Sequence, residues 1–179
     1  MIFHETGLPG AFLIEPERIS DARGFFARTW SAEELAERGL STRIAQCSVS
    51  YNAARGTLRG MHYQIEPHAE VKLVRCTAGA IYDVIVDLRP TSPTYRRHFG
   101  ATLSAASRMQ LYIPEGFAHG FLTLEDDSEV FYQISEPYAP AAGRGVRWDD
   151  PAFAIDWPGE VRVIAPRDAA YPDFTPEER

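Results

Sequence analysis

The sequence predicts an all-β protein, folded as an antiparallel sandwich or barrel, and two observations support this prediction. Strand-like segments recur about every ten residues, and turns rich in Gly, Pro, Asn and Asp separate them. Only one segment of the chain has a clear helical signature. Many short, evenly spaced strands with almost no helix are typical of sandwiches and barrels.

The expected strands run through most of the chain, and one helix interrupts them. The strand ranges are 11–15, 24–30, 43–51, 56–64, 71–77, 80–88, 99–103, 109–113, 120–124 and 129–136. The helix is expected over 31–39, with Ser31 as the candidate N-cap. Glu34 occupies the capping-box position, and Gly39 is suited to the C-terminal end. From Pro137 onward, frequent Pro and Asp predict an ordered loop region with a few short elements.

Alternation along three strands assigns side chains to the two faces of a sheet. The residues that share a face are Lys72 with Val74 and Cys76, Asp83 and Asp87 with Ile81 and Ile85, and Tyr132 with Val130 and Ile134. A polar side chain among apolar neighbours on an inward face is where a barrel places a ligand contact. The same pattern also fits edge or surface strands, so alternation alone leaves both interpretations open.

Length and composition limit the function further. The chain has 179 residues, which predicts a single domain spanning 1–179, and its net charge of −7 makes it a poor candidate for binding nucleic acid. Two cysteines, Cys47 and Cys76, are too few for a disulfide framework and are expected to be reduced. Neither a signal peptide nor a membrane-length apolar run is visible. We therefore expect a cytoplasmic enzyme or binding protein without a membrane partner.

The segment 56–64 contains the first candidate for chemistry, His62, with Gln64 on the same strand face. Arg59 has the opposite parity, but a bulge at Gly60 would bring Arg59 and His62 to one site. A hydrogen-bonded structural histidine is the competing interpretation of His62.

A second candidate segment, 112–121, contains Pro114, Gly116 and then His119. This spacing resembles the second motif of cupins, in which a turn presents a histidine to the interior of a small β-barrel. The resemblance implies a cupin-type double-stranded β-helix, or jelly-roll barrel, with a few short helices. In metal cupins the first motif supplies two histidines one residue apart, whereas here Gln64 stands at the second of these positions. A metal site from His62, Gln64, His68 and His119 remains an alternative.

Three further groups of residues could take part in binding or catalysis. Arg23, Arg59 and Lys72 could converge on a diphosphate, although each is also compatible with ordinary surface charge. Tyr132 could donate a proton to a developing carbanion, or serve as a core aromatic residue. Asp168, in the last polar loop, could support a histidine or be solvated.

Taken together, nine features resemble the dTDP-4-dehydrorhamnose 3,5-epimerase family in order and spacing, from about Arg18 to Pro172. They are DARGFF, LRGMHYQ, VKLV, DVIVDLR, IPEGFAHGF, the Tyr132/Tyr138 pair, WDDP, IDWP and RD. The resemblance implies a cupin-type barrel, a homodimer with an exchanged N-terminal strand, and no metal or other cofactor. It also implies epimerisation of a nucleotide-linked 4-keto-6-deoxyhexose at C3 and C5.

The resemblance assigns roles to individual residues. His62 matches the catalytic base and Asp168 the acid that pairs with it. Tyr132 matches the acid on the opposite face, and Lys72 the lysine near the C4 oxygen. Positions that line the nucleotide diphosphate-sugar site, some of them reached from the partner subunit, are matched by Arg23, Phe26, Gln46, Arg59, His119 and Tyr138.

The chain departs from the family pattern mainly at positions expected near the nucleotide and the rim of the sugar site. Glu70 stands where many members have Gln, and Ser135 begins a Ser-Glu-Pro segment that replaces a more usual Thr-Asp-Tyr. A single-site C3 or C5 epimerase that uses a CDP-, GDP- or other NDP-sugar is therefore an alternative. A metal-dependent cupin isomerase or oxygenase and a non-catalytic sugar-nucleotide-binding cupin are two more.

Overall fold

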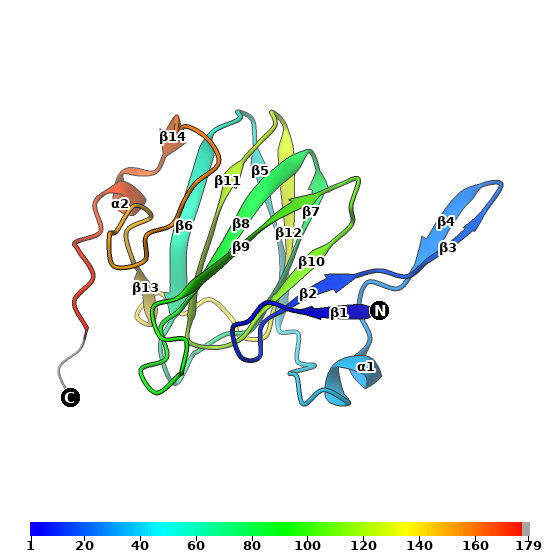
Figure 1. The fold of residues 1–179 in the computed structure, drawn as a ribbon, viewed down its shortest axis with the longest axis horizontal. Coiled ribbons are helices and arrows are strands. Elements are labelled where there is room, and N and C mark those ends of the chain that lie inside the picture. Colours follow the sequence, from blue (N-terminus) through cyan, green and yellow to red (C-terminus); the bar gives the residue numbers. More distant parts are fainter. Residues whose placement is uncertain (177–179) are drawn as a thin grey trace.

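The computed structural model describes residues 1–176, which form a barrel of two facing β-sheets (Figure 1). The first sheet contains, in spatial order, β1 (Ile2–Glu5), β2 (Phe12–Glu15), β10 (Gln110–Ile113), β7 (Lys72–Ala78), β12 (Ser128–Ile134) and β5 (Gln46–Asn52). The second contains β13 (Gly143–Gly145), β6 (Thr57–Gln64), β11 (Phe117–Thr123), β8 (Ala80–Asp87) and β9 (His98–Ser104). The short strand β14 (Val163–Ile164) pairs with β6 in parallel, whereas the other pairs are antiparallel. The predicted all-β, cupin-type fold is confirmed.

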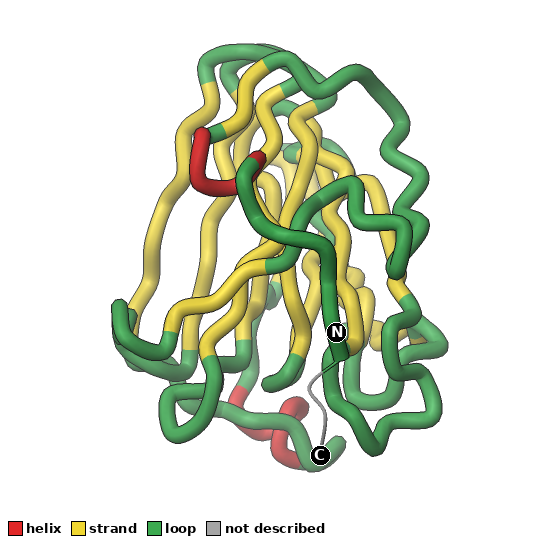
Figure 2. The backbone as a smooth tube through the Cα atoms, turned by 90° about the vertical axis from the view of Figure 1, so that its left-hand side faces the viewer, coloured by secondary structure: helices red, strands yellow, loops and turns green. Residues whose placement is uncertain are grey.

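Three small elements lie outside the barrel. A hairpin of β3 (Arg18–Asp21) and β4 (Gly24–Ala27) projects away from it, on the side opposite the C-terminal segment (Figure 1). Two short helices, α1 (Ala32–Ala36) and α2 (Pro166–Ala169), lie at its periphery (Figure 2). In the described part of the chain, no helix is long and apolar enough to cross a membrane.

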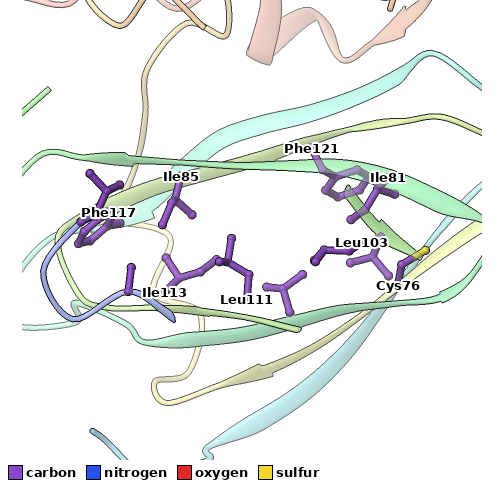
Figure 3. Close-up of a cluster of buried hydrophobic side chains, with 12 residues drawn as sticks. Cys76, Ile81, Ile85, Leu103, Leu111, Ile113, Phe117 and Phe121 are labelled. Atoms are coloured by element: carbon purple, nitrogen blue, oxygen red, sulfur yellow. The ribbon is translucent and has the colours of Figure 1, made fainter. Parts of the chain in front are cut away.

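The main core fills the space between the two sheets, where apolar side chains from both sides meet (Figure 3). Val74 and Leu111 come from the first sheet, and Ile81 and Phe121 from the second, all of them at most 1% exposed. Burial of a side chain of this size contributes about 1.5–3 kcal/mol relative to exposure. Alternation left inward and surface faces open, and the structure confirms the inward interpretation, including the face that carries Lys72.

The outer face of the second sheet is also covered. Val84 and Val86 on β8 pack there against Val146 and Phe153 of the C-terminal segment. This segment was predicted as loop with a few short elements, and as far as residue 176 it contains β13, β14 and α2. Both faces of β8 are buried, and both carry mainly apolar side chains; the exceptions on the inner face are Asp83 and Asp87, which are fully buried.

The end of β8 is fixed by a buried carboxylate. Asp87 accepts hydrogen bonds from the side chains of Arg89, Ser92 and Thr94 at 2.5–2.9 Å. Burial by itself would raise the pKa of Asp87, but these hydrogen bonds outweigh it and hold the pKa below its usual range. This carboxylate therefore anchors the loop that connects β8 to β9.

The first helix follows the prediction only in part. The Ser31 hydroxyl accepts a hydrogen bond from the Glu34 amide at 3.4 Å, which confirms Ser31 as N-cap. Gly39 adopts a left-handed φ of +68° beyond the helix end, as its position predicted. The helix itself is shorter than 31–39, and the Glu34 carboxylate binds the Met1 amino group at 2.7 Å. Only the Ser31 half of the capping box is therefore present.

Several strand boundaries differ from the sequence prediction. β1 and β3 were not predicted, and both are four-residue strands that exist through pairing with β2 and β4. β11 begins at Phe117 rather than at 120, because its first residues pair with the end of β8. Such extensions depend on partner strands that are distant in sequence, so local composition does not reveal them.

The two cysteines are free and lie in different environments. Cys47 on β5 is exposed, whereas Cys76 on β7 is buried in the main core. Burial raises the pKa of the Cys76 thiol to about 11. Cys76 therefore behaves as a small core residue at neutral pH.

Candidate functional site

A cavity of about 570 Å³ opens between the two sheets, and both sheets and the segment around β14 and α2 contribute to its lining. Its size is within the range of small-molecule sites. Six of the residues nominated from the sequence line it: Arg59, His62, Lys72, His119, Tyr132 and Asp168.

An irregularity in β6 brings two of these side chains together. The pairing of β6 with β11 shifts register between His62 and Arg59, at the position of Gly60. Gly60 has a φ of +137°, and a Cβ atom there would lie 2.5 Å from the Cα of Gly120. Only glycine fits this close approach of two backbones. Arg59 and His62 therefore both line the cavity, as the predicted bulge at Gly60 required.

His62 is held by a carboxylate from the other end of the chain. Its Nε2 lies 2.7 Å from Oδ1 of Asp168, whose Oδ2 accepts the Gly60 amide at 3.3 Å. The Asp168 side chain is 7% exposed, whereas the His62 ring is 43% exposed. Burial alone would raise the pKa of Asp168, but the hydrogen bond and charge of His62 and the Gly60 amide lower it. The ionised carboxylate holds the proton of neutral His62 on Nε2, which leaves Nδ1 free to accept a proton.

A second histidine–carboxylate pair lies deeper in the barrel. His119 Nε2 is 2.7 Å from Oδ1 of Asp83, and both side chains are almost fully buried. The other carboxylate oxygen, Oδ2, is buried without a hydrogen-bond partner among the described residues. The ring of Tyr132 packs edge-on to His119, with 6.1 Å between centroids.

Tyr132 is a partly buried phenol with the Asp83 carboxylate and the Arg59 guanidinium in its surroundings. Burial is the main factor that raises its pKa well above the usual range, and the Asp83 carboxylate adds to the effect. Ser50 on β5 hydrogen-bonds the Tyr132 side chain. Tyr132 is therefore protonated at neutral pH and able to donate a proton into the cavity.

Two cations complete the lining. Lys72 is the first residue of β7, and its Nζ contacts Oε1 of Glu70 at 2.7 Å and the His62 carbonyl oxygen at 3.3 Å. Arg59 donates from Nε to Oδ1 of Asn52 at 2.7 Å. A fixed ammonium group stabilises negative charge that develops on a nearby oxygen.

The arrangement suits one kind of chemistry. His62, from the second sheet, offers a lone pair, whereas Tyr132, from the first sheet, offers a proton. Lys72 stands beside the His62 backbone as a cation that can stabilise an enolate. A base and an acid from opposite sheets, with a cation in the same cavity, fit removal of a proton next to a carbonyl and its return on the other face.

The remaining four nominated residues do not line the cavity. Arg23 and Phe26 lie on the projecting hairpin, where Arg23 pairs with Asp21 and Phe26 is 74% exposed. Gln46 is the first residue of β5, and Tyr138 is exposed and hydrogen-bonded to the side chain of Arg167. Within one chain the structure therefore leaves these four apart from the cavity.

The alternative metal set is not assembled either. The Gln64 side chain donates to the carbonyl groups of His68 and Pro137 and accepts the Ala139 amide. It thereby fixes the loop that carries Tyr138. Across residues 1–176, no group of three or more His, Cys, Asp or Glu side chains could hold a metal ion.

Sequence reasoning missed several lining residues. Ser48 and Ser50 face the cavity from β5, and Val163 and Ile164 of β14 form another part of its wall. Ser48 lies opposite Tyr132 and Ser50 opposite Val130, so the pairing of β5 with β12 is what places the two serines at the cavity. No local signal marks β14, since it is two residues long and exists only through its pairing with β6.

Comparison with known proteins gives a consistent result. A family model described as dTDP-4-dehydrorhamnose 3,5-epimerase matches residues 5–176. The enzyme of that name from Sinorhizobium fredii is 41% identical over 175 residues, which cover 97% of this chain and 90% of the relative. A dTDP-4-dehydrorhamnose 3-epimerase from Streptomyces niveus is 40% identical over 169 residues, 94% of this chain and 81% of the relative.

Solved structures agree with the sequence relatives. The crystal structure of dTDP-4-dehydrorhamnose 3,5-epimerase from Bacillus anthracis, with TDP and PPi bound, superposes with a TM-score of 0.92. The two sequences are 41% identical, and the match covers 97% of this chain and 99% of the other. The chain therefore belongs to the dTDP-4-dehydrorhamnose 3,5-epimerase family, a family of isomerases.

Proposed function

We propose that this protein epimerises a nucleotide-linked 4-keto-6-deoxyhexose at C3 and C5, of the type that converts dTDP-4-dehydro-6-deoxyglucose to dTDP-4-dehydrorhamnose. The observation that carries the proposal is the His62–Asp168 pair, with Nε2 and Oδ1 2.7 Å apart, facing a cavity that also contains Lys72 and Tyr132. Binding alone requires neither a base nor an acid from opposing walls.

Each proposed role follows from the chemistry of the reaction. Both C3 and C5 are next to the C4 ketone, so a proton on either carbon becomes acidic when the enolate is stabilised. His62 takes this proton on Nδ1, and Asp168 stabilises the imidazolium that forms. Lys72 neutralises the charge on O4. Tyr132 then returns a proton to the opposite face, which inverts the carbon.

The proton balance of one inversion leaves His62 with an extra proton and Tyr132 without one. Exchange with solvent restores both groups: the His62 ring is 43% exposed and loses its proton to water, and Tyr132 regains one from water in the same cavity. Solvent hydrogen must therefore enter the sugar during turnover. Each acid or base partner is typically worth about 10²–10⁴ in rate.

Turnover in D₂O tests the proposal. The protein is incubated with dTDP-4-keto-6-deoxyglucose, and the sugar is analysed by NMR and mass spectrometry. Deuterium at C3 and C5 with inversion is the expected result. If no deuterium enters either carbon with any nucleotide form of the substrate, the proposal is wrong.

The number of centres and the nucleotide need separate measurements. Because the Streptomyces niveus relative is named a 3-epimerase, deuterium at C3 alone would favour the single-site alternative. We propose dTDP as the nucleotide, since the Bacillus anthracis relative was solved with TDP bound. Thermal unfolding with dTDP, UDP, GDP and CDP tests this choice, because a ligand specific to the folded state raises the melting temperature.

We also propose that two copies form a homodimer with an exchanged N-terminal segment, the β3–β4 hairpin. The hairpin projects from the barrel with Ile19 72% and Phe26 74% exposed (Figure 1). Exposed apolar side chains gathered in one place are typical of interaction sites. In such a dimer Arg23 and Phe26 would reach the partner's cavity. Light scattering tests the proposal, and a monomer at concentrations that support turnover would contradict it.

Two broader expectations remain proposals. We place the enzyme in the cytoplasm, where free thiols such as Cys47 and Cys76 persist in reduced form. We also treat residues 1–179 as a single domain, since the C-terminal segment supplies Asp168 to the same cavity as the barrel strands.

A further inference from the structure

Glu70 is a buried carboxylate for which the proposed reaction has no direct use. It lies two residues before Lys72, and its Oε1 is 2.7 Å from the ammonium nitrogen of that lysine. Both side chains are 10% exposed. Glu70 is not among the residues that line the cavity, whereas Lys72 is. Any effect of Glu70 on a bound sugar must therefore be transmitted through Lys72.

The contact with Glu70 helps to fix the orientation of the Lys72 ammonium group. Nζ carries three hydrogen-bond donors. One donates to Glu70 Oε1, and a second to the His62 carbonyl oxygen at 3.3 Å. Two fixed acceptors stop the rotation of the group, which leaves one N–H for a ligand. Because this carbonyl belongs to His62 itself, the contact fixes the position of the lysine relative to the base.

The electrostatics make the arrangement costly to disturb. A buried cation without a partner is strongly destabilised, and removal of one member of a buried pair leaves such a charge behind. The Lys72 stem is packed at the start of β7 between its neighbours on β10 and β12. Without Glu70, the ammonium group would therefore turn toward other acceptors or toward water in the cavity.

We propose that Glu70 is a positioning residue, which holds Lys72 Nζ against the His62 carbonyl and thereby aims the third N–H at the carbonyl oxygen of the substrate. The inference rests on the proposed function and adds a residue to it. Catalysis of this kind is sensitive to position, and a misplacement of about 1 Å costs up to about 100-fold in rate.

The test compares Glu70→Ala, Glu70→Gln and Glu70→Asp by kcat and KM for the NDP-4-keto sugar. The Ala variant removes the acceptor, and we expect kcat to fall about 10- to 100-fold with KM changed by less than about threefold. The Gln variant keeps an acceptor oxygen at the same reach, so its kcat should stay within about threefold of the parent. The Asp variant keeps the charge but is shorter by one methylene, and should be impaired.

A double-mutant cycle separates positioning from a general structural role. In a Lys72→Ala background, for which we expect low activity, Glu70→Ala should cost less than about twofold, because its effect is transmitted through the missing lysine. Glu129→Ala is the matched control, since Glu129 accepts a hydrogen bond from Thr77 at the other end of β7 at 2.7 Å. The control should have the kcat of the parent.

Three results would overturn the inference: full activity of Glu70→Ala, the same loss with and without Lys72, or a Gln variant as impaired as the Ala variant. If Glu70→Ala does not fold, the kcat values of the Gln and Asp variants decide between the two roles. Positioning predicts a higher kcat for Gln than for Asp, whereas a role of charge alone predicts a higher kcat for Asp. A parent protein without proton exchange on any NDP-4-keto sugar would instead refute the proposed function. An active parent that tolerates Glu70→Ala would remove only the role of Glu70.

Discussion

Replacement of Asp168 with Asn removes the charge that faces His62 while the shape of the site is preserved. Asp168 now accepts two hydrogen bonds, from His62 Nε2 at 2.7 Å and from the Gly60 amide at 3.3 Å. Asn has only one acceptor oxygen. If this oxygen faces His62, the amide group of Asn opposes the Gly60 N–H, and if it faces Gly60, the wrong tautomer of His62 is favoured.

The expected loss follows from the geometry. For charge centres about 4 Å apart at an effective dielectric constant of about 20, the attraction between carboxylate and imidazolium is about 4 kcal/mol. Water screens part of it, because the His62 ring is 43% exposed. A discount by half leaves about 2 kcal/mol, or about 30-fold in rate. The unpaired donor adds about 1–3 kcal/mol. The two effects together amount to about 3–5 kcal/mol, so we expect kcat to fall about 150- to 5,000-fold.

The assay follows loss of the substrate proton to D₂O by NMR, together with kcat for epimerisation. Asp149→Asn is the control, because Asp149 is an exposed carboxylate whose ion-pair partner within residues 1–176 is Arg147. Thermal unfolding verifies that Asp168→Asn is folded at the assay temperature. An Asp168→Asn variant within threefold of the parent, while His62→Ala is inactive, would refute the reasoning.

Three further predictions concern other parts of the molecule. Tyr132→Phe should reduce inversion about 100-fold or more. His62 should still remove the sugar proton and return deuterium to the same face, so NMR of the sugar in D₂O should show exchange with retention of configuration. Gly60→Ala should lower the free energy of unfolding by at least about 2 kcal/mol in chemical denaturation, because its Cβ would lie 2.5 Å from the Gly120 Cα at a φ of +137°. Asp87→Asn should lower the melting temperature at pH 7, and calorimetry should show this difference shrinking as the pH falls below about 4.

Each of these predictions has its own control or contradicting outcome. Inversion by Tyr132→Phe at the parental rate would assign the second proton to another group. Gly159→Ala is the control for Gly60, since a Cβ there meets only Leu122 at 3.7 Å. For Asp87 the sign is fixed by its lowered pKa, because the unfolded chain binds the proton first as the pH falls. A difference in melting temperature that grows in acid would contradict this assignment.

Much of the site could be predicted from local pattern. Alternation placed Lys72 and Tyr132 on the same faces as apolar residues, because a strand exposes successive side chains to opposite sides. Parity also indicated that Arg59 and His62 needed a bulge at Gly60, and the shift of register in β6 confirms it. The N-cap role of Ser31 was likewise visible, since a cap depends on residues that are adjacent in sequence.

Other features depend on contacts between distant segments. β1 and β3 are too short to be distinguished by composition, and their partners define them. The Glu34 carboxylate turned away from the capping box because the Met1 amino group, 33 residues away, offered a stronger partner. Ser48 and Ser50 were overlooked because small polar residues on an edge strand look like surface until the facing sheet is in place.

The all-β class, the side chains that share a face of each strand and the residue types available for proton transfer could all be predicted, since they follow from periodicity and from side-chain chemistry. Which of these residues meet depends on tertiary contacts. The fold brings Asp168 to His62 across 106 positions of the chain and pairs His119 with Asp83 inside the barrel. Hydrogen bonds and ion pairs need distances of a few ångströms between their atoms, and the closure of the two sheets sets these distances, whereas local sequence does not.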